Sequence, residues 1–397
     1  MIKRISILAA VVLVFSACEL QAEVINSKWV GPGDSAWAEP SNWSPSYVPC
    51  NSSFRTFAVR IEGGSSGVLV WLSQNCTIDE LTTYGVVQIT NYHLQVNQLE
   101  INGNLINNTG ANLSLFGHTY ISLNLRNETG AEMLAQDHVL INGDLDNAGV
   151  ITVLPITWIS ALHGLLLNKG QINIWGGVCG SDHGIFDNTG TIQGYGTVYS
   201  ASQSILNNGA IYAFGGSLTV GGVPLLTNNG ILGNKPSSAL HIKPVEDVNN
   251  NGTIEVNVGG GVVFDCNLVN EPNAVIKLLN GTITATTITQ AAGASFVGFG
   301  GITGNLIIES DGIIKLTGPT NIVGDVTIKE NAELEISDGQ VIVTGHTVCN
   351  GTIHLKGGRI VPQGGLSGDC NIISDPSDYN SMEDFAFLAE TWLWQIN

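Results

Sequence analysis

A short phrase recurs through most of the chain at a nearly fixed interval: an apolar residue, Asn, a small residue and a second apolar residue. Leu206-Asn207-Asn208-Gly209-Ala210-Ile211 is one copy. A period near 20 residues in Gly-, Asn-, Val- and Ile-rich sequence predicts a β-solenoid, in which each coil buries its apolar face only against neighbouring coils. The small residues of successive copies are 19 to 22 positions apart: Gly110, Gly130, Gly149, Gly170, Gly190, Gly209, Gly230, Gly252, Ala274, Gly293, Gly312, Ala332 and Gly351.

The repeat therefore predicts an all-β fold, a right-handed parallel β-helix of about 13 coils of about 20 residues each. We infer the handedness from the commonest solenoid of this coil length. Short strand-like runs such as Gln171-Ile172-Asn173-Ile174 alternate with Gly- and Asn-rich turns, as strand and turn signals require. We expect the solenoid to occupy residues 66–361.

Composition and charge agree with stacked coils and exclude one class of partner. Only 12% of the residues are charged and 49 of 397 are Gly, which suits buried strands joined by tight turns. The net charge is -19, with only 14 Lys and Arg residues. Neutralising phosphates requires clustered basic residues, so we expect no nucleic-acid partner.

The N-terminus has the layout of a secretory signal peptide, which we assign to residues 1–22. Lys3 and Arg4 precede an apolar run that ends at Phe15, and this run is too short to span a bilayer. Cleavage after Ala22 is one outcome. The other is a lipid anchor at Cys18, because Phe15-Ser16-Ala17-Cys18 resembles a bacterial lipobox. Both place the protein outside the cell or at the bacterial cell surface. No later segment has the pattern of a transmembrane helix, so we do not expect a transmembrane protein.

The recurrent Asn has a physical explanation. Asn tolerates left-handed turn geometry, and stacked Asn amides can hydrogen-bond from coil to coil along the interior. Counting two residues back from the small residue predicts a structural ladder that fades after Gly252. Its expected members are Asn108, Asn147, Asn168, Asn188, Asn207, Asn228 and Asn250.

Residues 23–65 differ from the repeat and contain three Trp residues, Trp29, Trp37 and Trp43, within 15 positions. We expect this segment to cap the open end of the solenoid. The alternative is a sugar-stacking platform of exposed Trp rings. The run from Trp29-Val30-Gly31 through Ser41-Asn42-Trp43 to Val48-Pro49 resembles the beginning of secreted, repetitive β-helical proteins of bacteria, of planctomycete-like and autotransporter-like kinds.

Six cysteines follow the leader, and an oxidising compartment permits disulfides between them. We expect Cys50 to pair with Cys76 near the start of the solenoid, and Cys349 to pair with Cys370 near its end. Cys179 and Cys266 are about four coils apart, or roughly 19 Å along the axis. This separation exceeds the reach of a disulfide, so we predict two buried free thiols.

The C-terminal segment departs from the repeat. Residues 362–380 form a Gly-rich exit and linker, and residues 381–397 predict an amphipathic helix in which Phe385, Leu388 and Trp392 share one face. This tail resembles the second half of a dockerin-like repeat, which implies Asp384 as a calcium ligand and a role in partner docking. The preceding residues lack the alternating Asp and Asn pattern of a calcium loop. We therefore expect no cofactor, with calcium at Asp384 as the alternative.

Chemistry that would make the chain an enzyme is sparse. The best local candidates are Asp182 and Asp187 with His183 between them. Two facing carboxylates can support glycoside hydrolysis, but the surrounding coil has no inserted loop that would build a pocket wall. The remaining histidines show no metal-binding spacing, apart from His346 and His354, which share one coil.

The regular coil length favours a non-catalytic secreted or cell-surface rod for adhesion, matrix assembly or glycan contact. Enzymes on this scaffold usually interrupt the coils with loops. The alternative is a polysaccharide-degrading enzyme, a lyase or glycoside hydrolase, or a carbohydrate-binding module on a pectate-lyase-like scaffold. The expected partner is a polysaccharide or a cell-surface protein.

Overall fold

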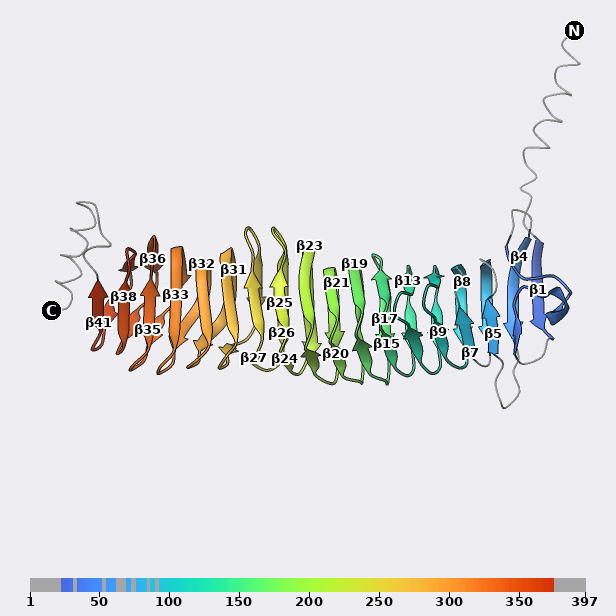
Figure 1. Ribbon diagram of the computed structural model, residues 1–397, viewed down its shortest axis with the longest axis horizontal. Helices are drawn as coiled ribbons and strands as arrows, with labels where there is room; N and C mark the ends of the chain where they lie inside the picture. Colours follow the sequence, from blue (N-terminus) through green and yellow to red (C-terminus); the bar gives the residue numbers. More distant parts are fainter. Residues whose placement is uncertain are drawn as a thin grey trace, which may run out of the picture.

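A computed structural model describes residues 23–30, 34–51, 55–61, 69–72, 76–83, 86–89 and 93–374. In this part of the chain the protein is a β-solenoid of about 14 turns, stacked as a rod with the first strands at one end and the last at the other (Figure 1). The prediction of an all-β solenoid of parallel coils is confirmed. Within these residues the only helical element is a single 3-10 turn, η1 (Pro40–Asn42).

Three ladders of parallel strands run along the rod, and each coil contributes one segment to each ladder. The first ladder contains the shortest strands, most of them three residues long and placed just before the recurrent turn. Its members are β2 (Asp34–Ala36), β5 (Leu69–Leu72), β7 (Val86–Ile89), β9 (Leu105–Asn107), β12 (Leu125–Asn127), β15 (Leu145–Asn147), β18 (Leu166–Asn168), β20 (Phe186–Asn188), β22 (Ile205–Asn207), β24 (Leu226–Asn228), β27 (Val248–Asn250), β30 (Leu268–Asn270), β34 (Val326–Ile328), β37 (Thr347–Cys349) and β40 (Leu366–Ser367).

The second ladder follows the recurrent turn. Its separate strands are β10 (Asn112–Leu115), β13 (Glu132–Ala135), β16 (Val150–Val153), β25 (Ile231–Asn234), β28 (Thr253–Val256), β35 (Glu333–Ile336), β38 (Thr352–Leu355) and β41 (Asn371–Ser374). The third ladder completes each coil with β11 (Thr119–Ile121), β14 (Val139–Ile141), β17 (Trp158–Ala161), β26 (Ala239–Pro244), β29 (Gly261–Phe264), β36 (Gln340–Val343) and β39 (Arg359–Pro362).

In several coils one long strand continues around the corner from the second ladder into the third. These strands are β6 (Cys76–Thr83), β8 (His93–Ile101), β19 (Gln171–Ser181), β21 (Thr191–Ser200), β23 (Ala210–Val223), β31 (Val275–Gln290), β32 (Ser295–Ile308) and β33 (Ile313–Val323). The last residues of β31 and β32 also pair in the first ladder.

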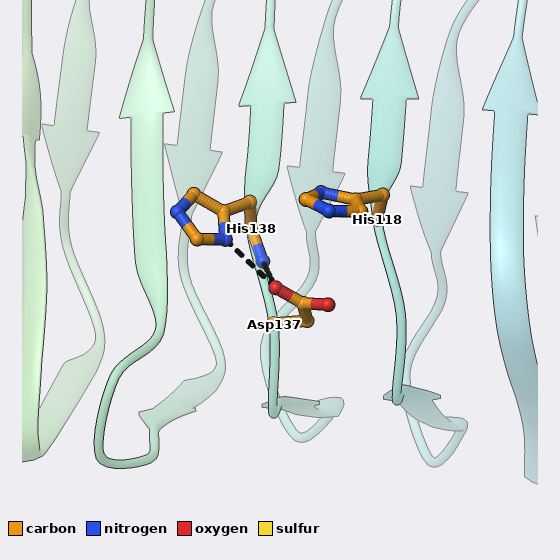
Figure 2. A group of neighbouring side chains, drawn as sticks. All are labelled: His118, Asp137 and His138. Carbon is orange, nitrogen blue, oxygen red and sulfur yellow. Dashed lines mark hydrogen bonds and ion pairs between the residues drawn. The ribbon is translucent and has the colours of Figure 1, made fainter.

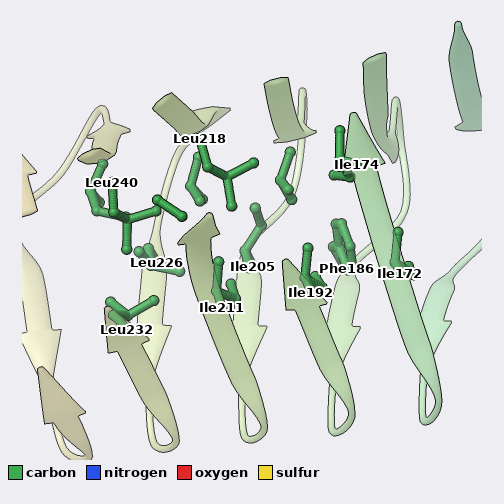
Figure 3. Packing of buried hydrophobic residues seen from close by; sticks show 14 of the residues in the cluster. Ile172, Ile174, Phe186, Ile192, Ile205, Ile211, Leu218, Leu226, Leu232 and Leu240 are labelled. Carbon is green, nitrogen blue, oxygen red and sulfur yellow. The ribbon is translucent and has the colours of Figure 1, made fainter. Parts of the chain in front are cut away.

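The core is one continuous column of apolar side chains along the rod axis. The three-residue strands bury their first and third residues and turn the middle one outward. Neighbouring coils stack like residues, so that Ile172, Ile192 and Ile211 lie in consecutive layers (Figure 3). Each fully buried Ile or Leu contributes about 1.5–3 kcal/mol, and the parallel register repeats this gain at every coil.

Close stacking explains why the small residue of the repeat is Gly in the middle coils. A Cβ added to Gly190 would lie 2.1 Å from the Gly170 carbonyl oxygen, and one added to Gly209 would lie 2.0 Å from that of Gly190. The backbones of successive turns therefore touch at this position. Any larger residue would force the coils apart.

An amide ladder runs through the interior beside these glycines, as predicted, but it is longer. Nine hydrogen bonds of 2.6–2.9 Å join the side-chain amide of one coil to the amide oxygen of the next. Most donors also reach a backbone carbonyl of the next coil, as Asn207 does with Ile231 at 3.0 Å. All ten side chains are fully buried: Asn107, Asn127, Asn147, Asn168, Asn188, Asn207, Asn228, Asn250, Asn270 and Gln290.

The prediction of Asn108 as a ladder member is wrong, because the ladder residue is its neighbour Asn107. In the coils that begin at Asn107 and Asn127, two more residues separate the amide from the next strand than in the coil of Asn147. Gly110 takes a left-handed φ of 77° to accommodate this longer turn. Counting back from Gly110 with the spacing of the later coils therefore selects the wrong Asn. Asn270 and Gln290 also extend the ladder beyond Gly252, where it was expected to fade.

The stack extends beyond the predicted limits of 66–361. At the first end β1 (Glu23–Trp29) pairs in parallel with β4 (Arg55–Ile61), which pairs with β6. At the other end β41 pairs with β38 and β40 with β37. The first part of the predicted exit and linker is therefore a further coil, as far as Ser374.

The three N-terminal Trp side chains form a packed cluster. Trp29, Trp37 and Trp43 are at most 4% exposed, and the Trp43 ring meets the other two edge-on at centroid distances of 4.8 and 4.7 Å. Trp43 lies on β3 (Trp43–Ser44), which pairs antiparallel with β1. Burial of the three rings excludes an exposed sugar platform at these residues.

Candidate functional site

A group of aromatic and imidazole side chains lies on the outer face of the third ladder. Thr119, Val139 and Ile159 are register partners on successive coils, so the residues before them, His118, His138 and Trp158, form one outward row. The ring centroids of His118 and His138 are 5.3 Å apart, and those of His138 and Trp158 are 6.4 Å apart. We call His118, His138, Trp158 and Tyr199 the aromatic surface.

Tyr199 fixes the orientation of Trp158. Its Oη accepts a hydrogen bond from the Trp158 indole N–H at 2.9 Å, lies 2.7 Å from Ser160 Oγ, and donates to Asp182 Oδ1 at 2.6 Å. Burial, together with the hydrogen bond to the Asp182 carboxylate, raises the pKa of Tyr199 above its usual value. The phenol therefore stays neutral and holds the Trp158 side chain, which is 40% exposed.

A glycine makes room for this arrangement. Gly180 is the register partner of Tyr199 on the preceding coil, and a Cβ there would lie 2.3 Å from the Tyr199 ring. The ring therefore lies against the backbone at Gly180 and reaches Ser160, two coils back. Of the partners of Tyr199, only Asp182 was predicted as a site residue. Tyr199 is 41, 39 and 17 residues from Trp158, Ser160 and Asp182, and these unequal separations form no sequence motif.

A second aromatic group lies where the second ladder turns into the third. Trp175 has ring-centroid distances of 6.0 Å to both Tyr195 and Phe214. Phe214 is 45% exposed. These residues, which we call the corner cluster, belong to β19, β21 and β23, the strands that continue around the corner. Both aromatic groups therefore occupy neighbouring coils in the middle of the rod.

The three catalytic candidates are engaged in separate interactions. Asp182 accepts from Tyr199, while Asp187 Oδ1 accepts from Asn208 Nδ2 at 3.3 Å. His183 stacks on His163 with an interplanar angle of 5° and lies 3.3 Å from Ser202 Oγ. Within residues 93–374 no hydrogen bond or ion pair joins these three side chains to one another. The arrangement is that of outward turn and strand residues with their own partners.

Two shallow hollows lie elsewhere on the rod. One, of about 430 Å³, lies over β10, β13 and β16 and includes Glu132. The other, of about 370 Å³, lies over the Gly-rich surface around Gly281 and Gly300. Neither lining contains Asp182, His183 or Asp187, so these candidate residues face neither of the two hollows.

Two groups of potential metal ligands occur among the described residues. One is His118, Asp137 and His138, which Figure 2 shows on adjacent coils. The other is Glu333, Glu335 and His354. Burial raises the pKa of Glu335, but hydrogen bonds from Lys356 and Ser337 and the charges of Lys315 and Lys356 outweigh it and lower the pKa overall. The charge of Glu335 is therefore largely compensated by two lysines.

The predictions of a Cys349–Cys370 disulfide and of a buried free thiol at Cys179 are confirmed, whereas the predicted full burial of Cys266 is wrong. Cys349 and Cys370 form a disulfide with a Cα–Cα distance of 4.9 Å. Cys179 is a fully buried free thiol, and Cys266 is a partly buried one. The side chain of Cys76 lies outside the described residues, so its pairing with Cys50 stays a prediction.

Several predicted features fall outside the described residues. These are the signal peptide at 1–22 with the lipid-anchor candidate Cys18, and the C-terminal helix at 381–397 with the calcium-ligand candidate Asp384. Within the described ranges, no helix is long and apolar enough to cross a membrane.

Comparisons with known proteins do not assign the chain to a family. The chain matches no family model, and neither the curated proteins nor the solved structures searched contain a match.

Proposed function

We propose that the protein is a non-catalytic rod, secreted or held at the bacterial cell surface, that contacts glycans through the aromatic surface and the corner cluster. Such contact would serve adhesion or matrix assembly. The observation that carries the proposal is Trp158, whose indole is exposed and yet held in place by Tyr199. Rigid aromatic side chains supply contact area at a low entropic cost.

The chemistry of the surface suits sugar rings. The C–H face of a pyranose packs on an indole or phenol ring, while hydroxyl groups of the sugar bond to neighbouring polar groups. Imidazoles of His118 and His138 provide such polar groups beside Trp158. The coil spacing of about 4.8 Å repeats these groups along one direction, which fits an extended polymer. The net charge of -19 favours neutral or cationic glycans over acidic ones.

A binding-and-turnover screen tests this function. The purified protein is incubated with neutral, cationic and acidic polysaccharides, with and without calcium, and both retention and released reducing ends or unsaturated products are measured. We expect retention on a neutral or cationic polymer without product, weakened about tenfold or more by Trp158→Ala or Trp175→Ala. Val245→Ala is the matched control, because Val245 is 83% exposed and lies outside both aromatic groups.

Three results would overturn the proposal. Product release would establish the polysaccharide-degrading alternative. Retention that is unchanged in both Trp variants would move the binding surface elsewhere on the rod, and retention on no glycan would favour a protein partner.

We also propose export through residues 1–22, on the sequence pattern alone. N-terminal sequencing of the exported protein is the test. A start at Glu23 supports simple cleavage, a lipid-modified Cys18 supports an anchor, and an unprocessed Met1 contradicts both.

A further inference from the structure

His118, Asp137 and His138 bring two imidazoles and a carboxylate together across adjacent coils (Figure 2). His138 Nδ1 lies 2.7 Å from Asp137 Oδ1, and one ligand atom from each of the three residues lies within 4.8 Å of the others. The side chains of His138 and Asp137 are 40% and 34% exposed. All three groups are therefore accessible to a dissolved ion.

We propose that these three residues form a surface site for a divalent transition-metal ion, with Zn²⁺ as the ion tested first. Imidazole nitrogen and carboxylate oxygen are the ligands that Zn²⁺, Ni²⁺ and Cu²⁺ accept in proteins. A metal at about 2.0–2.2 Å from each ligand atom holds these atoms at most about 4.4 Å apart, so the exposed side chains would rotate to bind it. The outward position leaves further coordination positions for water or an external donor. This proposal does not depend on the glycan function.

The charge around the site favours a cation. Asp137 Oδ1 lies 2.7 Å from both the backbone nitrogen and the Nδ1 atom of His138, so the acidic group faces the imidazole. Among the described residues, Asp137 forms an ion pair with the His138 imidazole. In the other group Glu335 already pairs with Lys356 at 3.1 Å and Lys315 at 3.6 Å. A metal there would have to compete with two ammonium groups.

The chain contains a natural comparison for this site. His163 and Asp182-His183 repeat the spacing of His118 and Asp137-His138, with the two histidines 20 residues apart and Asp directly before the second. In that pair the rings stack at 5.2 Å and Asp182 is bound by Tyr199. Two neighbouring His rings thus occur twice, tilted by 36° in the first pair and stacked in the second. Only in the first pair does the carboxylate of the preceding Asp contact an imidazole.

Calorimetric titration of Zn²⁺ into the untagged, EDTA-treated protein tests the assignment. We expect one site per chain, weakened about 100-fold by His118→Asn with His138→Asn and about tenfold by Asp137→Asn. The matched control, His163→Asn with His183→Asn, keeps the wild-type affinity. Circular dichroism confirms that each variant is folded. Absence of a site in the wild type, wild-type affinity in the first double variant, or an equal loss in the control would each overturn the proposal.

Trp158 provides a second measurement, because its ring centroid is 6.4 Å from that of His138. Cu²⁺ and Ni²⁺ quench indole fluorescence at short range. We expect saturable quenching that largely disappears in Trp158→Phe, while calorimetric binding by that variant persists. Quenching of the same size in Trp158→Phe would place the ion beside another Trp and contradict the assignment.

Discussion

Tyr199 Oη donates to Asp182 Oδ1 at 2.6 Å and accepts from Trp158 Nε1 at 2.9 Å. One phenol thus joins three coils: it hydrogen-bonds to Asp182, the strongest catalytic candidate predicted from the sequence, and holds the exposed indole of Trp158. The same contact therefore argues against acid–base chemistry at Asp182 and for a prepared binding surface at Trp158.

Tyr199→Phe tests this contact. The variant keeps the ring against Gly180 but removes the acceptor of Trp158 and the donor to Asp182, so we expect a loss of about 1–2 kcal/mol in the free energy of unfolding. Urea denaturation measures the loss. Tyr120→Phe is the control, because Tyr120 is 39% exposed on the same ladder, and it should change stability by less than about 0.5 kcal/mol. Equal effects of the two substitutions would show that the hydroxyl network at Tyr199 contributes nothing.

Asn207→Ala should be more damaging than its neighbour Asn208→Ala. Asn207 accepts from Asn188 and donates to Asn228, both at 2.7 Å in a fully buried row. Its loss leaves a buried donor and a buried acceptor without partners, which costs about 2–4 kcal/mol. The bonds of Asn208 are exposed, so its replacement should cost less than about 1 kcal/mol. Chemical denaturation compares the two, and similar losses would contradict the interior ladder.

The Cys179 thiol should resist alkylation in the folded protein. Complete burial raises its pKa from 9.0 to about 12, and the thiolate is the reactive form. Iodoacetamide at pH 8 should label Cys179 only after urea is added, as peptide mass mapping would show. Labelling of the native protein at this position would contradict its burial.

The same shift predicts a pH dependence of stability. The folded pKa lies above the unfolded one, so burial of the neutral thiol stabilises the fold fully below pH 9, and this contribution is lost as the pH rises toward 12. Cys179→Ala should therefore show a shallower decline in unfolding free energy over that window than the wild type. An identical decline would assign the pH dependence to other groups.

The disulfide should protect the last coils. Cys349–Cys370 closes a loop with a sequence separation of 21, and a loop of this size is worth about 3 kcal/mol. Dithiothreitol, or Cys370→Ser, should make the segment after β37 cleavable by limited proteolysis while the middle coils stay resistant. Cys266→Ser is the control, because Cys266 forms no disulfide. Unchanged protection after reduction would show that strand pairing alone holds the end of the rod.

The sequence period was sufficient to predict the architecture, because a coil of fixed length places equivalent residues in equivalent layers. It was not sufficient for the exact register. Asn107 was missed in favour of Asn108 because a turn two residues longer precedes the next strand, and only the backbone shows that Gly110 takes a left-handed φ there.

The surface was harder to predict than the core. A spacing of 20 residues is one coil, so His118 and His138 were predictable neighbours, yet spacing alone does not separate them from His163 and His183. The two His pairs differ in the contact of the preceding Asp: Asp137 contacts His138, whereas Asp182 is bound by Tyr199 from the next coil. Such long-range partners carry no local sequence signal, whereas the buried Ile and Asn rows carry one in every repeat.

Fluorine NMR of protein labelled with 5-fluorotryptophan tests the central claim most directly. The polysaccharide retained in the screen is titrated in, and resonances are assigned with Trp158→Phe and Trp175→Phe. We predict that the Trp158 and Trp175 resonances shift saturably, while those of the buried Trp29, Trp37 and Trp43 do not. Saturable glycan binding that shifts neither the Trp158 resonance nor the Trp175 resonance would contradict the assignment of glycan contact to the aromatic surface and the corner cluster.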